Sequence, residues 1–263
     1  MKTYTSSLIF SIFILLVSFF LSGYKYTPHK GTYISLAPSI TEVIYAINAQ
    51  NNLLAVTMWS DYPEDAKKKP QVGDAIFINK EAIIKLKPEI IFAVENHKIL
   101  IDDLKNIGIQ VYYFPSRNID DVYTNILTIG KITGRKSKSE HLVKALKNEQ
   151  NKLKPVKKRK KIFYVVQGEP LITIGSDTFI GDLIKKSGQD SITASIKGSY
   201  IKVNQEYVIS KHPDIVYVYD KETANYLSPY IKSKYVVLTE QQKNILNRPG
   251  PRIIQSLKIF SSL

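Results

Sequence analysis

The chain alternates short runs of β-branched and aromatic residues with longer segments whose apolar residues recur at helical spacing. Such alternation is typical of parallel sheets covered by helices. We therefore predict an α/β fold in which seven runs form strands. The predicted strands are residues 33–37, 53–57, 89–94, 110–114, 161–166, 214–219 and 235–239.

The first strand leads directly into a helix. Ser39 and Glu42, which follow Pro38, have the spacing of a capping box ahead of a helical apolar pattern. Because ligands of open α/β sheets bind beyond the carboxyl ends of the strands, residues 35–38 are expected at a ligand-binding edge. Capping already accounts for Ser39, and no histidine lies near it in sequence, so we do not assign it as a nucleophile.

Two groups of strands are separated by a long polar helix. Residues 136–154 are rich in Lys, Glu, Leu and Ala, with leucines at mostly helical spacing, and the segment ends before Pro155. We expect an N-terminal α/β lobe at 32–135, one connecting helix at 136–154 and a C-terminal α/β lobe at 160–263. A helical connector is stiff, so only small lobe motions are expected.

An internal repeat supports two lobes of the same construction. Residues 78–92 match residues 203–217 with five identities in fifteen positions, and five further positions are conservative exchanges. Each copy has an Asn that can cap a helix, a Glu in the first turn and a proline after the helix. The alternative is that any two αβ units look somewhat alike. The two lobes would create a cleft for a small molecule between them.

Composition and charge narrow the class of protein. The chain of 263 residues is 44% hydrophobic and 23% charged, which excludes disordered, collagen-like and polytopic membrane classes. It has no cysteine, so disulfides, thiolate metal sites, Cys nucleophiles and lipidation on Cys are excluded. The net charge is +14, but the lysines are spread and lack interleaved aromatic residues. We expect no nucleic-acid partner.

The N-terminus predicts export. After Lys2 no charge occurs until Lys25, and residues 8–21 are apolar apart from two serines. Small residues at 22–23 offer a cleavage site, so residues 1–23 are predicted to be a signal peptide. An uncleaved membrane anchor is the alternative. Either way we expect a periplasmic or other extracytoplasmic protein.

Motifs for catalysis and metal binding are missing from the sequence. We find no G-x-S-x-G elbow, P-loop, G-x-G-x-x-G fingerprint or H-E-x-x-H motif, and the four histidines are scattered. We expect no resident cofactor, no metal site and no enzymatic activity. An exported α/β enzyme acting in the cleft is the rival interpretation.

Five segments occur in the order found in one family of binding proteins: Ile34 to Glu42, Trp59 to Pro63, Val72 to Asp74, Leu86 to Ile91 and Leu104 to Val111. Together with the segment 251–254 they resemble the cobalamin/iron-siderophore (class III) periplasmic binding proteins. The resemblance covers about residues 32–262 and is strongest to the vitamin B12-binding members. It implies two Rossmann-like lobes with parallel sheets, joined by one long helix around a ligand cleft.

The resemblance also implies a function. Such a protein captures its ligand and delivers it to the permease dimer of an ABC importer, and we expect it to be a monomer. Cobalamin or a related corrinoid is the expected ligand, as cargo rather than cofactor. Haem and ferric siderophores remain alternatives, because aromatic and arginine side chains also suit iron chelates.

The resemblance further implies site residues. It places Pro38, Trp59, Tyr200 and Arg248 at the ligand, and Phe77 stands near a position where the B12-binding members have a tryptophan. A packed core aromatic is the alternative role for Trp59, and a surface cation is the alternative for Arg248.

Glu81 and Glu206 are the acids of the internal repeat. They match the two glutamates with which the family docks on permease arginines, one from each lobe. A favourable interaction with the helix dipole is the simpler role for both, and the two roles are compatible.

Overall fold

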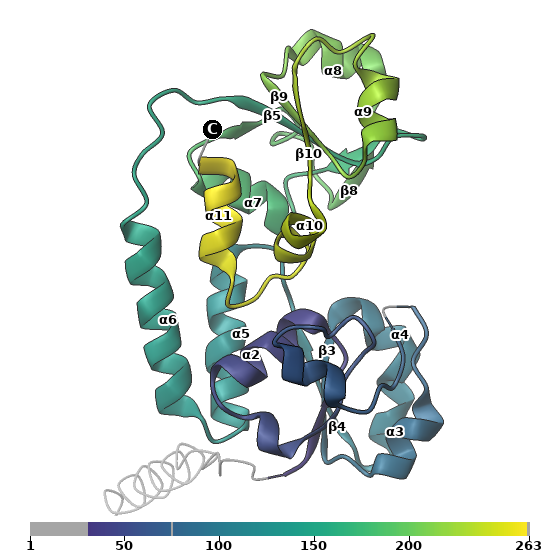
Figure 1. The fold of residues 1–263 in the computed structure, drawn as a ribbon. Coiled ribbons are helices and arrows are strands. Elements are labelled where there is room, and N and C mark those ends of the chain that lie inside the picture. The colour runs from purple at the N-terminus through teal and green to yellow at the C-terminus, as the bar shows by residue number, and fades with distance from the viewer. Residues whose placement is uncertain (1–30, 75, 262–263) are drawn as a thin grey trace, which may run out of the picture.

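The structure is a computed structural model that describes residues 31–74 and 76–261. The N-terminal lobe contains a parallel four-stranded sheet with strand order β2-β1-β3-β4 (Figure 1). Its strands are β1 (Tyr33–Ser35), β2 (Leu53–Ala55), β3 (Ile90–Val94) and β4 (Gln110–Phe114), and its helices are α2 (Pro38–Ala46), α3 (Lys80–Leu86) and α4 (Lys98–Ile101).

The C-terminal lobe contains a six-stranded mixed sheet. Its order is β10-β9-β5-β6-β8, with β7 paired to β5; β5 is parallel to β7 and β9, whereas β6 is antiparallel to both β5 and β8. The strands are β5 (Lys161–Gln167), β6 (Ile172–Ile174), β7 (Asp190–Ser191), β8 (Tyr200–Lys202), β9 (Ile215–Val218) and β10 (Lys234–Val237). The helices are α7 (Phe179–Lys186), α8 (Gln205–Lys211), α9 (Lys221–Leu227), α10 (Glu240–Leu246) and α11 (Ile253–Ser261).

All seven predicted strands are present, and the predicted α/β fold with two lobes is confirmed. The antiparallel strands β6 and β8 were not predicted. They are three residues each, too short to show a clear alternation in the sequence. They extend the parallel part of the second sheet toward the cleft.

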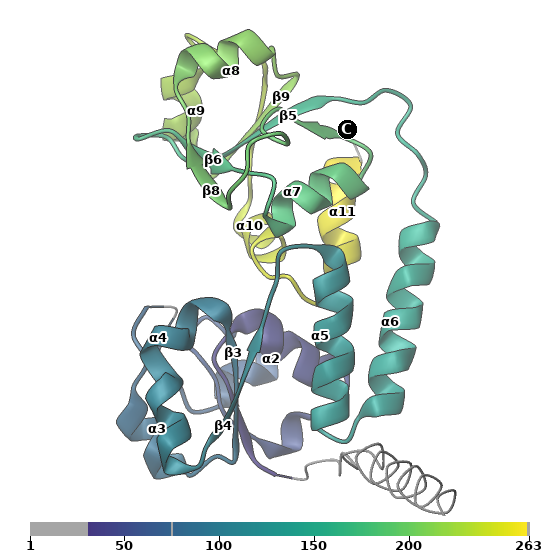
Figure 2. The same ribbon diagram turned by 180° about the vertical axis from the view of Figure 1, so that it is seen from behind.

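Two helices connect the two sheets in chain order. α5 (Ile119–Ile132) and α6 (Lys136–Asn151) pack side by side, as Figures 1 and 2 show from opposite sides. α5 also contacts α2 of one lobe and α7 of the other. The connection therefore includes a helix that packs on both lobes, in addition to α6.

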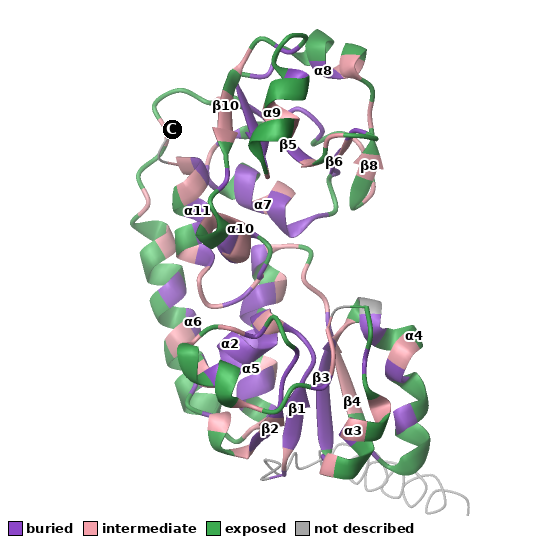
Figure 3. Ribbon diagram, turned by 45° about the vertical axis from the view of Figure 1, so that its right-hand side comes forward, coloured by how far each residue is buried: buried purple, intermediate pink, exposed green. Residues whose placement is uncertain are grey.

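The largest cluster of buried hydrophobic residues runs through both lobes. It includes Phe92 of the first sheet, Ile126 of α5 and Tyr164 of the second sheet, all of which are at most 1% exposed (Figure 3). A shared core resists separation of the lobes, because opening it would expose apolar surface to water.

The two copies of the internal repeat have the same local structure. The Asn79 and Asn204 side chains each accept a hydrogen bond of 2.9 Å from the backbone N–H three residues later, so both cap their helices as predicted. Lys87 and His212 end the two helices with left-handed φ values of 50° and 49°. Equal caps, lengths and ends make α3 and α8 equivalent elements of the two lobes.

The capping box predicted at Ser39 and Glu42 is wrong. α2 has Ala37 as its N-cap and Pro38 in its first turn, and no side chain among the described residues caps it. Proline suits the first helical position, so the helix begins two residues earlier than predicted. Glu42 is then too far along the helix to reach its N-cap, and its carboxylate is available for other partners.

Candidate ligand-binding site

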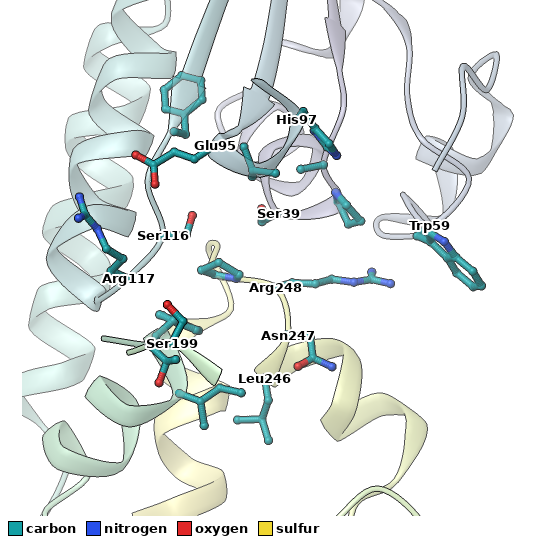
Figure 4. A pocket seen from close by; sticks show the side chains of 18 of the residues that line it. Ser39, Trp59, Glu95, His97, Ser116, Arg117, Ser199, Leu246, Asn247 and Arg248 are labelled. Atoms are coloured by element: carbon teal, nitrogen blue, oxygen red, sulfur yellow. The ribbon is translucent and has the colours of Figure 1, made fainter. Parts of the chain in front are cut away.

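A cavity of about 600 Å³ lies between the two lobes (Figure 4). Its upper wall in that view is formed by the N-terminal lobe, where Ala37 and Pro38 follow β1, Val94 ends β3 and Phe114 ends β4. These are the carboxyl ends of parallel strands, the expected position of a ligand in an α/β sheet.

The opposite wall belongs to the C-terminal lobe. It is formed by the start of α7, by Tyr200 at the start of β8, and by the segment from Asn244 to Pro249 that joins α10 to α11. The lining mixes apolar side chains with hydroxyl and amide groups, among them Ser39, Ser116, Ser199 and Asn247. Such a surface suits a large ligand with scattered polar groups.

Four of the five predicted ligand residues line this cavity: Pro38, Trp59, Tyr200 and Arg248. Trp59 and Tyr200 are 57% and 65% exposed, so Trp59 is not a packed core aromatic. Each lobe therefore presents an aromatic side chain to the space between them. Two exposed aromatic side chains, one from each lobe, offer the large apolar contact that a flat ligand needs.

Phe77 does not line the cavity. It lies in an exposed turn, where the Asp74 carboxylate accepts hydrogen bonds of 2.7 Å from the backbone N–H groups of Ile76 and Phe77. These bonds hold the pKa of Asp74 below its usual value. The turn lies beside the Trp59 segment, because the Met58 N–H donates to the Gly73 carbonyl at 2.9 Å.

Arg248 is buried, so it is not a surface cation. Its side chain is 8% exposed, and its guanidinium pairs with Asp61 of the opposite lobe. A second nitrogen donates to Asn244 at 3.2 Å, and the Glu42 carboxylate lies 3.6 Å away. The Arg248 guanidinium holds the pKa of Asp61 below its usual value.

A second arginine makes a parallel contact across the lobes. Arg252 donates from Nε and Nη2 to the two oxygens of Glu42, at 2.8 and 2.5 Å, and its guanidinium lies over the Tyr62 ring at 4.4 Å from the centroid. Burial raises the pKa of Glu42, and its pairing with Arg252 and Arg248 opposes that rise. We call these four groups, Glu42, Asp61, Arg248 and Arg252, the interlobe ion cluster.

The interlobe ion cluster was not foreseen from the sequence. Asp61 and Arg252 stand in segments that carry the family resemblance, but Asp61 pairs with Arg248 and Arg252 pairs with Glu42, each about 190–210 positions away. Arg117, Glu95 and Asp177 of the cavity lining were also missed, because each lies in a loop or short turn without a distinctive pattern.

The charged groups that line the cavity cancel. Glu95 and Asp177 are acidic, and Arg117 and Arg248 are basic, whereas the whole chain carries a net charge of +14. The lining thus does not share the positive charge of the protein. A site that selects strongly anionic ligands would present an excess of cations.

Among the described residues, no group of three or more His, Asp or Glu side chains could hold a metal ion. Within residues 31–74 and 76–261, no helix combines the length and hydrophobicity that a membrane crossing needs. The predicted signal peptide, residues 1–23, lies outside the part that the structure describes.

Residues 34–243 match the sequence model of a family described as periplasmic binding protein. The chain belongs to the periplasmic binding protein family. The resemblance found in the sequence is thereby confirmed, and the family is one of solute-binding proteins rather than enzymes. Its members work outside the cytoplasm, in agreement with the expected export.

Two curated relatives illustrate the position of this periplasmic binding protein in its family. An uncharacterised ABC transporter substrate-binding lipoprotein of Bacillus subtilis is 28% identical over 243 residues, which are 86% of this chain and 77% of the relative. A vitamin B12-binding protein of Vibrio vulnificus is 28% identical over 241 residues, 86% of each chain.

Solved structures show the same architecture. A protein of Staphylococcus epidermidis described as a possible iron-binding, periplasmic solute-binding protein has a TM-score of 0.74 at 28% identity, over 89% of this chain and 98% of that one. The periplasmic vitamin B12-binding protein of Vibrio cholerae has a TM-score of 0.70 at 25% identity, over 89% and 96%. A haem-binding protein of Vibrio cholerae has a TM-score of 0.76 at 22% identity, over 88% and 98%, and shows the fold alone.

Proposed function

We propose that this periplasmic binding protein captures cobalamin or a related corrinoid and delivers it to an ABC importer. The observation that carries the proposal is the balanced charge of the cavity between two aromatic side chains. Corrinoids are flat macrocycles whose periphery carries mainly neutral amides, which match hydroxyl, amide and aromatic contacts. The B12-binding relatives of Vibrio support the same ligand class.

Haem or a ferric siderophore is the second candidate. The observation in its favour is the exposed phenol of Tyr200 in the cavity, since a tyrosine oxygen is a common ligand of haem iron. Against it stands the lack of excess cations, because haem carries two carboxylates, whereas the two acids of the lining match its two arginines and one of these, Arg248, is also paired with Asp61. The similarity to the possible iron-binding protein of Staphylococcus epidermidis supports this second candidate.

Delivery requires a permease, and one acid on each lobe is placed to contact it. Glu81 and Glu206 occupy the second position of α3 and α8, are exposed, and have no ion-pair partner among the described residues. α3 and α8 lie at opposite ends of the molecule (Figure 1). We propose that the two carboxylates dock on arginines of the two permease subunits.

The proposal also covers export, oligomeric state and lobe boundaries. Residues 1–23 direct export, with cleavage or membrane anchoring as alternatives, and the protein acts as a monomer. The lobes comprise residues 32–135 and 160–263, with 136–154 between them. The shared core and the packing of α5 on both lobes support a binding protein whose lobes move only slightly.

Titration with cyanocobalamin tests the ligand. Trp59 is the only tryptophan and lines the cavity, so a bound corrinoid, which absorbs in its emission range, quenches its fluorescence. We expect saturable one-to-one binding with a free energy of about −8 kcal/mol or more favourable, checked by calorimetry. Haemin that binds and produces a shifted Soret band, while cyanocobalamin does not bind, would transfer the assignment to haem.

Trp59→Ala tests whether the indole contacts the ligand. We expect cyanocobalamin affinity to fall about tenfold or more, because large aromatic contacts dominate such sites. Calorimetry measures the change, since the variant has lost its fluorophore. Tyr230→Ala is the matched control: Tyr230 is 56% exposed and does not line the cavity. Equal affinities of the two variants would exclude a ligand contact at Trp59.

A further inference from the structure

The segment that carries Trp59 is held at two points. On one side, Ser60 is 2% exposed, and its hydroxyl lies 3.1 Å from that of Thr41 and 3.2 Å from that of Thr57. These contacts belong to the N-terminal lobe. On the other side, the Asp61 carboxylate pairs with Arg248 and the Tyr62 ring lies under the Arg252 guanidinium, and both arginines belong to the opposite lobe.

The arginines that hold the segment are themselves fixed. They lie within the turn 247–252, where Gly250 approaches α2 so closely that an added Cβ would lie 3.2 Å from the Ser39 carbonyl oxygen. Arg248 is further held by Asn244 and Glu42. Figure 4 shows its side chain extending along the space between the lobes in the direction of Trp59.

The formal charges of the interlobe ion cluster cancel, since two carboxylates face two guanidinium groups. Arg248 reaches the cavity, yet its guanidinium is neutralised mainly by Asp61. An anionic group on a ligand would have to compete with that carboxylate. Asp61 therefore influences the charge that the ligand meets and, through the 3.0 Å hydrogen bond from its N–H to the Trp59 carbonyl oxygen, the backbone that carries the indole.

We propose that Asp61 is a positioning residue of the ligand site, which by pairing with Arg248 fixes the segment that carries the Trp59 indole and keeps that guanidinium from attracting anionic ligands. The position of the Trp59 segment thereby depends on the distance between the lobes, because the arginines that contact it belong to the C-terminal lobe. A separation of the lobes would release the indole. The selectivity part of this inference rests on the proposed function, whereas the positioning part does not.

The positioning part is tested on ligand-free protein by time-resolved fluorescence anisotropy of Trp59. We expect Asp61→Asn to raise the amplitude of the subnanosecond component about twofold, since an unpinned side chain reorients on the picosecond-to-nanosecond timescale. Asp65→Asn is the matched control, because Asp65 is a nearby exposed acid that pairs with Lys68 instead. Asp61→Glu should restore most of the wild-type amplitude.

The partner residue provides an independent variant. Arg248→Gln should raise the fast amplitude as Asp61→Asn does, and the double variant should add little, because both remove one interaction. An unchanged amplitude in Asp61→Asn, an equal rise in Asp65→Asn, or additive effects in the double variant would overturn the positioning role. None of these outcomes depends on which ligand the protein binds.

The selectivity part is tested with haemin, which carries two carboxylates, and dicyanocobinamide, which has amide side chains. We expect Asp61→Asn to tighten haemin binding about fivefold by freeing Arg248, and to change dicyanocobinamide binding less than twofold. Haemin binding that is equal in wild type and variant would overturn the selectivity role. If wild type binds no corrinoid, the proposed ligand fails, and the anisotropy and haemin results still decide the role of Asp61.

Discussion

Glu42→Gln is expected to lower the free energy of unfolding by about 3–5 kcal/mol, which is the usual result of breaking a buried ion pair. The Glu42 side chain is 1% exposed, and its two oxygens accept from Arg252, whose side chain is 12% exposed. The raised pKa of Glu42 shows that burial opposes its charge. Replacing the Glu42 carboxylate with the Gln amide nevertheless destabilises the protein, because the amide cannot neutralise the guanidinium groups that remain buried.

Urea unfolding followed by circular dichroism measures this effect. Glu64→Gln is the matched control, since Glu64 is exposed and pairs with Lys67 on the surface; we expect a change within about 0.5 kcal/mol. Replacing both partners, as Glu42→Leu with Arg252→Met, should recover much of the lost stability. A Glu42→Gln variant as stable as Glu64→Gln would mean that the arginines find other partners.

The fold was predictable because its signals are local. Each parallel strand is a continuous apolar run, and the repeat places an Asn cap, a first-turn acid and a later proline at fixed distances within about fifteen residues. Such features depend on backbone conformation over a few positions, which neighbouring residues determine. The capping box failed for the same reason, because Pro38 provided a competing local signal for the start of α2.

The candidate site was predictable only in part. Pro38 and Trp59 follow predicted strands, so the topology alone places them near the cleft. The state of Arg248 depends on Asp61 and Glu42, which are about 190–210 residues away, and no local pattern specifies that pairing. Gly73 is hydrogen-bonded to Met58, next to Trp59, and Phe77 lies only four residues beyond Gly73. The turn that contains Phe77 nevertheless leaves this side chain outside the cavity lining.

Glu81→Ala combined with Glu206→Ala is expected to reduce ligand uptake about 100-fold and to leave ligand affinity unchanged within twofold. Each variant removes a charged contact to the permease, and a hydrogen bond to a charged group contributes about 1.5–3 kcal/mol. Neither acid lines the cavity. Uptake of labelled cyanocobalamin is measured in cells of the source organism that lack the chromosomal copy and carry the variant, and affinity is measured on purified protein.

Glu222 provides a close control for the docking prediction. It occupies the second position of a seven-residue helix with a capped start, as Glu81 and Glu206 do, but α9 has no counterpart in the repeat. If the acids only interact favourably with their helix dipoles, Glu222→Ala should resemble Glu81→Ala and Glu206→Ala made singly. All three variants should then lower stability slightly and change uptake very little. If the acids dock, each single variant should reduce uptake while Glu222→Ala does not. Loss of ligand affinity in the double variant would instead place the two acids in the binding site, and would overturn the two-point docking.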